Sequence, residues 1–158
     1  MTEETGRKVL LPVDLSDNAM RAVQWYFKYG KLPNDDVILF HSVDTSTIIP
    51  GTDFTWAEPL PVEAVETNLK NKEKEAKELK IKCENVLKEA AVKGEYVDAI
   101  ANHAGEAIVE YCTKHKVDYI IMGNRGMGAI RRTFMGSVSD YVLHHARIPI
   151  TIIPPPLQ

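Results

Sequence analysis

Five short apolar segments, separated by stretches with helical periodicity, constrain the fold of this 158-residue chain most strongly. They cover residues 8–14, 36–43, 95–100, 117–122 and 148–153. Runs of this kind are typical of strands that are buried on both faces of a parallel sheet. The intervening stretches place apolar residues on one face at helical spacing, and the longest covers residues 62–93 and is expected to end at Gly94. The alternation predicts an α/β fold, an open and mainly parallel five-stranded sheet with helices on both faces.

Composition narrows the class of protein. The chain is 44% hydrophobic and 26% charged, which is ordinary for one soluble globular domain, so residues 1–158 are expected to form a single domain. A net charge of −3 provides no basic field for nucleic acid or an anionic membrane surface. No apolar run approaches the roughly 20 residues that cross a bilayer. Two isolated cysteines and a polar, acidic start without a targeting pattern predict a cytoplasmic protein.

The fourth apolar segment leads into a loop rich in glycine and arginine. Gly123 follows the segment, Arg125 and Gly126 come next, and the pair Gly136–Ser137 opens a helical stretch. Glycine lets a backbone approach a ligand closely, and the N–H groups at the start of a helix attract anions. The pattern therefore predicts a loop that binds phosphate groups.

Two neighbouring features support a phosphate site at this loop. The run from Ser137 to Asp140 resembles a capping box, which places the start of the helix at Ser137. Arg131 and Arg132 supply further donors suited to phosphate oxygens, although one of them could be a simple surface charge.

The best-known phosphate loops do not fit this sequence. A P-loop requires a lysine after its second glycine, and the loop has none. A dinucleotide fingerprint that starts at Gly126 has Arg131 at its third glycine position, and it lies late in the chain. What remains is the spacing glycine, two residues, glycine, nine residues, then Gly-Ser.

This spacing, after the strand at 117–122, resembles the ATP-binding signature of the universal stress protein family. Segments 9–16, 39–44 and 149–154 resemble the first, second and last strands of the family, in the same order. Leu15 departs from the pattern, because the family often has glycine there. The resemblance implies a Rossmann-like fold. It also implies an ATP site in which an aspartate contacts the ribose, a valine lies beside the adenine and the glycine loop holds the phosphates. Carried over, that site comprises Pro12, Val13, Asp14, Val43, Met122, Gly123, Arg125, Gly126, Gly136, Ser137, Val138 and Ser139.

Asp14 has two readings from the residues alone, as a cap of the helix that follows it or as a ribose contact. The resemblance favours the ribose. In an open parallel sheet, ligands bind at the carboxyl ends of strands where the winding reverses, so Asp14 and Gly123 can meet if the first and fourth strands are neighbours. Asp14 could also hold Mg²⁺ beside the phosphates, which would permit slow hydrolysis.

The last apolar segment suggests a partner. Pro149 interrupts a β-branched run, which predicts a strand at the edge of the sheet. The family resemblance implies a homodimer joined through the strand that runs from Ile148 to Ile153. The alternative is that the proline-rich tail shields this edge.

The expected function is that of a small ATP-binding protein of the universal stress type, in which bound nucleotide biases conformation or partner binding in a stress response. The alternatives are an enzyme that hydrolyses ATP slowly and a nucleotide-free interaction module. The loop lacks a convincing nucleophile, general base or carboxylate pair, so no catalytic residue is assigned. Adjacent helical residues diverge, so the pair His144 and His145 is not assigned to a metal. The intact glycine spacing argues against the nucleotide-free module.

Overall fold

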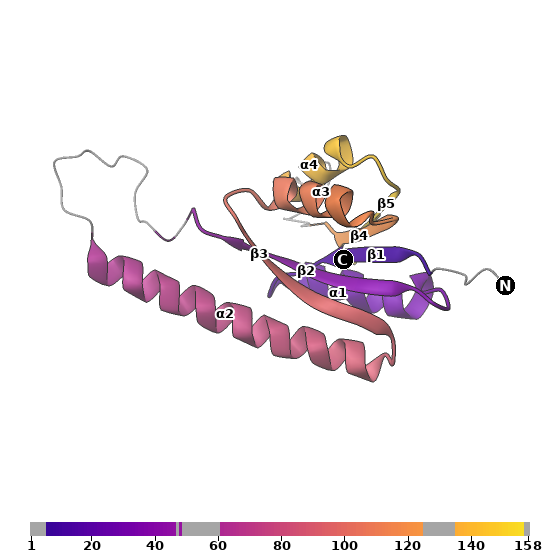
Figure 1. Ribbon diagram of the computed structural model, residues 1–158, viewed down its shortest axis with the longest axis horizontal. Coiled ribbons are helices and arrows are strands. Elements are labelled where there is room, and N and C mark those ends of the chain that lie inside the picture. Colours follow the sequence, from indigo (N-terminus) through magenta and orange to yellow (C-terminus); the bar gives the residue numbers. More distant parts are fainter. Residues whose placement is uncertain (1–5, 47, 49–60, 125–134, 157–158) are drawn as a thin grey trace.

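The computed structural model describes residues 6–46, 48, 61–124 and 135–156 (Figure 1). Strands and helices alternate along this part of the chain, as the sequence predicts. The elements are β1 (Lys8–Pro12), α1 (Asp17–Trp25), a π-helical turn η1 (Tyr26–Gly30), β2 (Asp36–Asp44), α2 (Val62–Glu89), β3 (Lys93–Ala101), α3 (Ala104–His115), β4 (Tyr119–Gly123), α4 (Ser137–His145) and β5 (Ile150–Ile153).

The strands form one parallel sheet in the order β3-β2-β1-β4-β5. The first three strands build outward to one edge, and the chain then returns so that β4 pairs with the free side of β1. Leu10 at the centre of β1 pairs with Ile38 on one side and with Ile120 on the other. The predicted open, parallel, five-stranded sheet is confirmed. The winding reverses between β1 and β4.

Helices cover both faces of the sheet (Figure 1). Alternation along β1 sends Val9 and Leu11 to the face covered by α1 and α2, and Leu10 to the face covered by α3 and α4. Two apolar cores result, one on each side. The central strands are therefore buried on both faces, which explains their nearly continuous apolar sequence.

Helix α2 is 28 residues long, and its first half reaches beyond the sheet (Figure 1). Its buried residues are Leu79, Cys83 and Leu87, which recur every four positions on one face. The prediction that this helix continues to residue 93 and ends at Gly94 is wrong. The helix ends at Glu89, and Gly94 lies inside β3, where an added Cβ would come within 2.7 Å of the Val37 carbonyl oxygen. A close approach of β3 to β2 requires the glycine, not a helix end.

The outer strands also differ from their predicted bounds. The last strand begins at Ile150 and not at 148, because Pro149 has no N–H group to donate to a ladder. The predicted edge position of this strand is confirmed. The third strand extends from Lys93 to Ala101, beyond the predicted 95–100.

A buried carboxylate ties the start of the chain to the first helix and the second strand. The side chain of Asp35 is 2% exposed. It accepts hydrogen bonds from Arg7 Nε at 2.9 Å, Arg7 Nη2 at 3.1 Å, the Tyr26 hydroxyl at 2.7 Å and the Leu32 amide at 2.9 Å. Burial alone would raise the pKa of Asp35, but the hydrogen bonds from Arg7, Leu32 and Tyr26 outweigh it and hold that pKa below its usual value.

Replacing this carboxylate should destabilise the fold in a pH-dependent way. Asp35→Asn is expected to lower the free energy of unfolding at pH 7 by about 2 kcal/mol, because Arg7 and Tyr26 lose a charged acceptor. A carboxyl group with a lowered pKa stabilises the fold above the ordinary aspartate value of about 3.9 and loses that contribution as the pH falls through its folded value. The gap between wild type and variant in urea unfolding should therefore shrink between pH 5 and pH 3. Equal stability at pH 7 would contradict this account.

Candidate functional site

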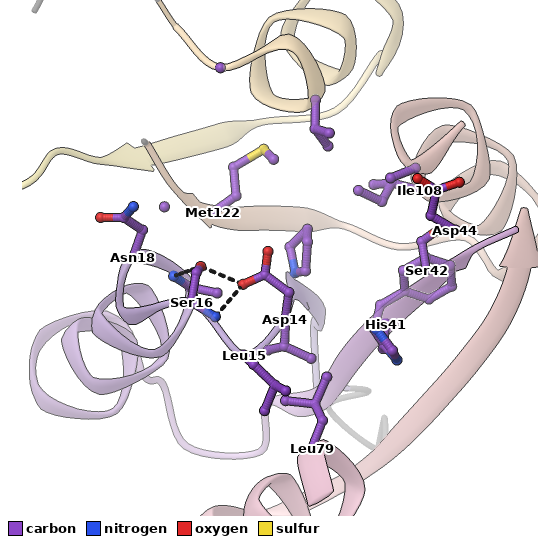
Figure 2. Close-up of a pocket in the computed structure, with 18 of the residues that line it drawn as sticks. Asp14, Leu15, Ser16, Asn18, His41, Ser42, Asp44, Leu79, Ile108 and Met122 are labelled. Atoms are coloured by element: carbon purple, nitrogen blue, oxygen red, sulfur yellow. Dashed lines mark hydrogen bonds between the residues drawn. The ribbon is translucent and has the colours of Figure 1, made fainter. Parts of the chain in front are cut away.

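A pocket of about 450 Å³ opens at the carboxyl ends of β1, β2 and β4 (Figure 2). This volume lies within the range of about 300–1,000 Å³ that is usual for small-molecule sites. The first turns of α1, α3 and α4 and the middle of α2 complete its walls. The lining residues are Pro12 to Ser16, Asn18, Ala19, Phe40 to Asp44, Lys72, Glu75, Leu79, Ala104, Ile108, Met122, Gly123 and Gly136 to Ser139.

The structure brings together the predicted site residues that it describes. Three segments far apart in sequence meet because β1 pairs with both β2 and β4. Arg125 and Gly126 lie outside the described residues, as do Arg131 and Arg132. The predicted residues that line the pocket are Pro12, Val13, Asp14, Val43, Met122, Gly123, Gly136, Ser137, Val138 and Ser139.

Asp14 shapes the turn after β1 and also lines the pocket (Figure 2). Its Oδ1 accepts a hydrogen bond from the Ser16 amide at 2.9 Å and another from the Ser16 hydroxyl. Ser16 Oγ in turn accepts from the Ala19 amide at 3.3 Å and so caps α1. Capping therefore falls to Ser16, while Asp14 keeps its carboxylate at the pocket wall. Leu15, the departure from the family pattern, also lines the pocket and is 44% exposed.

Gly123 is required by packing at the end of β4. A Cβ atom at this position would lie 2.3 Å from the carbonyl oxygen of Asn18 and 2.8 Å from its carbonyl carbon. These atoms belong to the backbone of α1, which cannot move aside as a flexible side chain can. The absence of a side chain at Gly123 thus lets β4 end directly against the first turn of α1.

Helix α4 begins at the pocket, and no side chain among the described residues caps it. The predicted helix start at Ser137 is confirmed, but the predicted capping box is wrong, because the N-cap is Gly136, which has no side chain. The Gly136 amide donates to Asn124 Oδ1 at 3.4 Å, which links the two described ends that flank residues 125–134. The first-turn N–H groups of a helix carry partial positive charge. The start of α4 can therefore accept an anion at the pocket, whereas Ser16 already caps the start of α1.

Several lining residues were missed by the sequence reasoning. Lys72, Glu75 and Leu79 come from α2, and no local pattern shows that this helix packs beside the strand ends. His41 is recognisable in the sequence, because it is a polar residue near the end of a mostly apolar strand. Its Nδ1 lies 2.9 Å from Asp98 Oδ1 and 3.0 Å from the Tyr96 hydroxyl, so neighbouring β3 fixes the orientation of the ring.

Comparison with known proteins identifies the family. The model of the universal stress protein family matches residues 6–154. The chain belongs to the universal stress protein family. A universal stress protein of Methanocaldococcus jannaschii, MJ0577, is 31% identical over 154 residues, which cover 93% of this chain and 94% of that protein.

Solved structures agree with this family assignment. The structure of the hypothetical protein MJ0577 superposes with a TM-score of 0.70 at 27% identity and covers 98% of this chain and 99% of its own. A universal stress protein family member from Arabidopsis thaliana, solved with AMP bound, has a TM-score of 0.67 at 18% identity, with coverage of 94% and 91%. At 18% identity the likeness is one of fold. Over the residues described here, no helix has the length and apolar character needed to cross a membrane.

The packing at Gly123 makes a direct prediction about stability. Gly123→Ala should lower the midpoint of thermal unfolding by several degrees, because its Cβ must push the end of β4 away from the α1 backbone. Gly30→Ala is the matched control, since the three atoms nearest to its Cβ would all belong to side chains, of Trp25 at 3.0 Å, Tyr26 at 3.4 Å and Ile121 at 3.7 Å. Thermal melts followed by circular dichroism would measure both. Equal midpoints for the two variants would refute the packing argument.

Proposed function

We propose that this protein is a cytoplasmic, single-domain ATP-binding protein, in which the nucleotide, with Mg²⁺ on its phosphates, regulates partner binding in a stress response. The observation that carries the proposal is the composition of the pocket at the switch point of the sheet. The start of α4, which no side chain of the described residues caps, lies there together with the carboxylate of Asp14. The first suits an anion and the second suits hydroxyl donors.

The pocket extends over the ends of three neighbouring strands, β4, β1 and β2, and the proposal assigns one part of the nucleotide to each. In the proposal, Gly123, Gly136 and the first turn of α4 hold the phosphates, together with Arg125 and Gly126. Asp14, on the neighbouring strand β1, accepts hydrogen bonds from the ribose. The base then lies over the end of β2, near Val43, with Pro12, Val13 and Met122 lining the space between. Ser137, Val138 and Ser139 supply amide and hydroxyl donors at the phosphate end.

A regulatory role follows from where the proposed ligand lies. The pocket is lined by segments of β1, β2, β4 and of the helices α1, α2, α3 and α4, so one bound molecule would contact most of the fold. A ligand favours whichever arrangement of its contacts binds it best. Binding of ATP would therefore fix the relative positions of these elements and alter the surface that partners meet.

The role of Asp14 can be separated from its part in the turn. Asp14→Ala should weaken ATP binding about tenfold to a hundredfold, the loss expected for a hydrogen bond to a charged acceptor. Ser16→Ala, the control, removes the hydroxyl that bonds Asp14 but leaves the carboxylate in place. Isothermal titration calorimetry should show strong loss in the first variant and little in the second. Equal losses would mean that Asp14 acts only through the turn, and no binding of ATP to the wild type would defeat the proposed function.

The second part of the proposal is a homodimer formed through β5. This strand pairs with β4 on one side, where the carbonyl groups of Pro149 and Ile153 accept from Ile120 and Asn124 at 3.0 and 2.9 Å. Because backbone groups alternate in direction along a strand, those of Ile150 and Ile152 face the outer edge of the sheet. An apolar edge of this kind favours pairing with another strand, here β5 of a second copy.

The dimer can be tested with one substitution at that edge. Ile152→Pro removes an outward N–H group without removing a ladder bond to β4, and proline is tolerated on edge strands. Sedimentation velocity should show a dimer for the wild type and a monomer for the variant, with circular dichroism reporting a retained fold. A wild type that sediments as a monomer at micromolar concentration would rule out the dimer.

A further inference from the structure

One buried hydroxyl in the pocket lacks a partner. Ser42 Oγ is buried and makes no hydrogen bond within the part of the chain that the structure describes. Buried polar atoms are nearly always hydrogen-bonded, because an unpaired one loses its bonds to water without replacement. Ser42 also lines the candidate nucleotide pocket (Figure 2). A hydroxyl left unpaired at such a place points to a ligand atom as its partner.

The position of Ser42 in β2 gives the direction of its side chain. Ile38 and Phe40 belong to the core on the α3 side of the sheet, together with Ile108. Successive strand residues point to opposite faces, so Ser42, two residues after Phe40, lies on that same face. Phe40, Ala104 and Ile108 also line the pocket and are apolar. The Ser42 hydroxyl thus lies beside apolar lining residues that suit the flat face of an aromatic ring.

The neighbours of Ser42 across the sheet indicate which part of a nucleotide it would meet. Gly123 is the last residue of β4, Asp14 follows β1, and Ser42 lies on β2, the next strand along. The start of α4 lines the same pocket. If the phosphates lie at the end of β4 and the ribose lies at the end of β1, then the base lies at the end of β2. The ribose is therefore nearer to Asp14 than to Ser42.

We propose that the Ser42 hydroxyl hydrogen-bonds the edge of the nucleobase and is a specificity-determining residue of this pocket. The inference rests on the proposed nucleotide-binding function. A serine hydroxyl donates one hydrogen bond and accepts others, so it can pair with an amino group or a ring nitrogen of a purine. Its unpaired state in the free protein is then a cost to stability that ligand binding removes.

This assignment predicts opposite effects on stability and on binding. Ser42→Ala removes the unpaired hydroxyl, so the thermal midpoint of the free protein should stay unchanged or rise. The same variant should raise the Kd for ATP about tenfold, because the base loses one hydrogen bond in a buried site. Tripolyphosphate, which has no base, should bind wild type and variant equally. Thr113→Ala is the control, since its hydroxyl already donates to the Val109 carbonyl at 2.9 Å on an exposed part of α3.

Other outcomes would overturn the inference. Equal ATP affinity in wild type and Ser42→Ala would do so while leaving the proposed function intact, whereas a wild type that binds no ATP defeats the proposed function itself. An equal loss for ATP and tripolyphosphate would show an effect on pocket shape. A penalty that vanishes with 2′-deoxy-ATP would assign the hydroxyl to the ribose. Ser42→Cys keeps the shape with a weak donor and should also lose affinity, which provides the test if the alanine variant does not fold.

Discussion

The parallel pairing of β1 with β4 is the interaction on which the rest of the structure depends. The strands pair at Val9 with Tyr119 and at Leu10 with Ile120, and the Asp118 amide extends the contact by donating to the Lys8 carbonyl at 2.9 Å. Strands that close by short turns cannot pair in parallel, so each crossover must carry a helix over a face of the sheet. Because β4 returns to the free side of β1, the helices divide between the two faces. The pocket opens at the place where they divide.

The fold was predictable because its signals are local and repeated. Five apolar runs separated by helical periodicity admit few architectures, and the structure has the one predicted. One error comes from a residue whose role depends on a distant neighbour, and another from the exact position of a helix cap. Gly94 has the appearance of a helix end, yet it is a glycine because Val37 of the adjacent strand lies too close for a side chain. The pattern from Ser137 to Asp140 satisfies a capping box, but the preceding glycine takes the cap position.

The candidate site was predictable in part for the same reason. Asp14, Val43 and Gly123 stand at the ends of apolar runs, and the ends of parallel strands meet at one edge of a sheet. The part of the wall formed by Lys72, Glu75 and Leu79 could not be predicted in this way. A charged helix face has the same sequence pattern whether it faces solvent or a pocket. Several of the residues that form the site also shape the fold. Asp14 orders a turn, and Gly123 admits the backbone of α1. A substitution at these positions can therefore weaken binding by disturbing the fold. Only comparison with a second variant, which disturbs the same contacts but keeps the functional group, separates the two effects.

The length of α2 has a mechanical consequence. Leu79 belongs to the buried core and also to the pocket wall, so the helix is held at the point where it meets the proposed ligand. From Leu79 back to Val62 the helix extends for about 25 Å at the usual rise of 1.5 Å per residue. A tilt of about 5° at Leu79 would displace the far end by about 2 Å, by the geometry of a rigid rod of that length. A tilt of α2 about Leu79 therefore moves the far end of the helix more than it moves the pocket wall. A small change in how the pocket is filled would produce a larger displacement at that distant part of the surface.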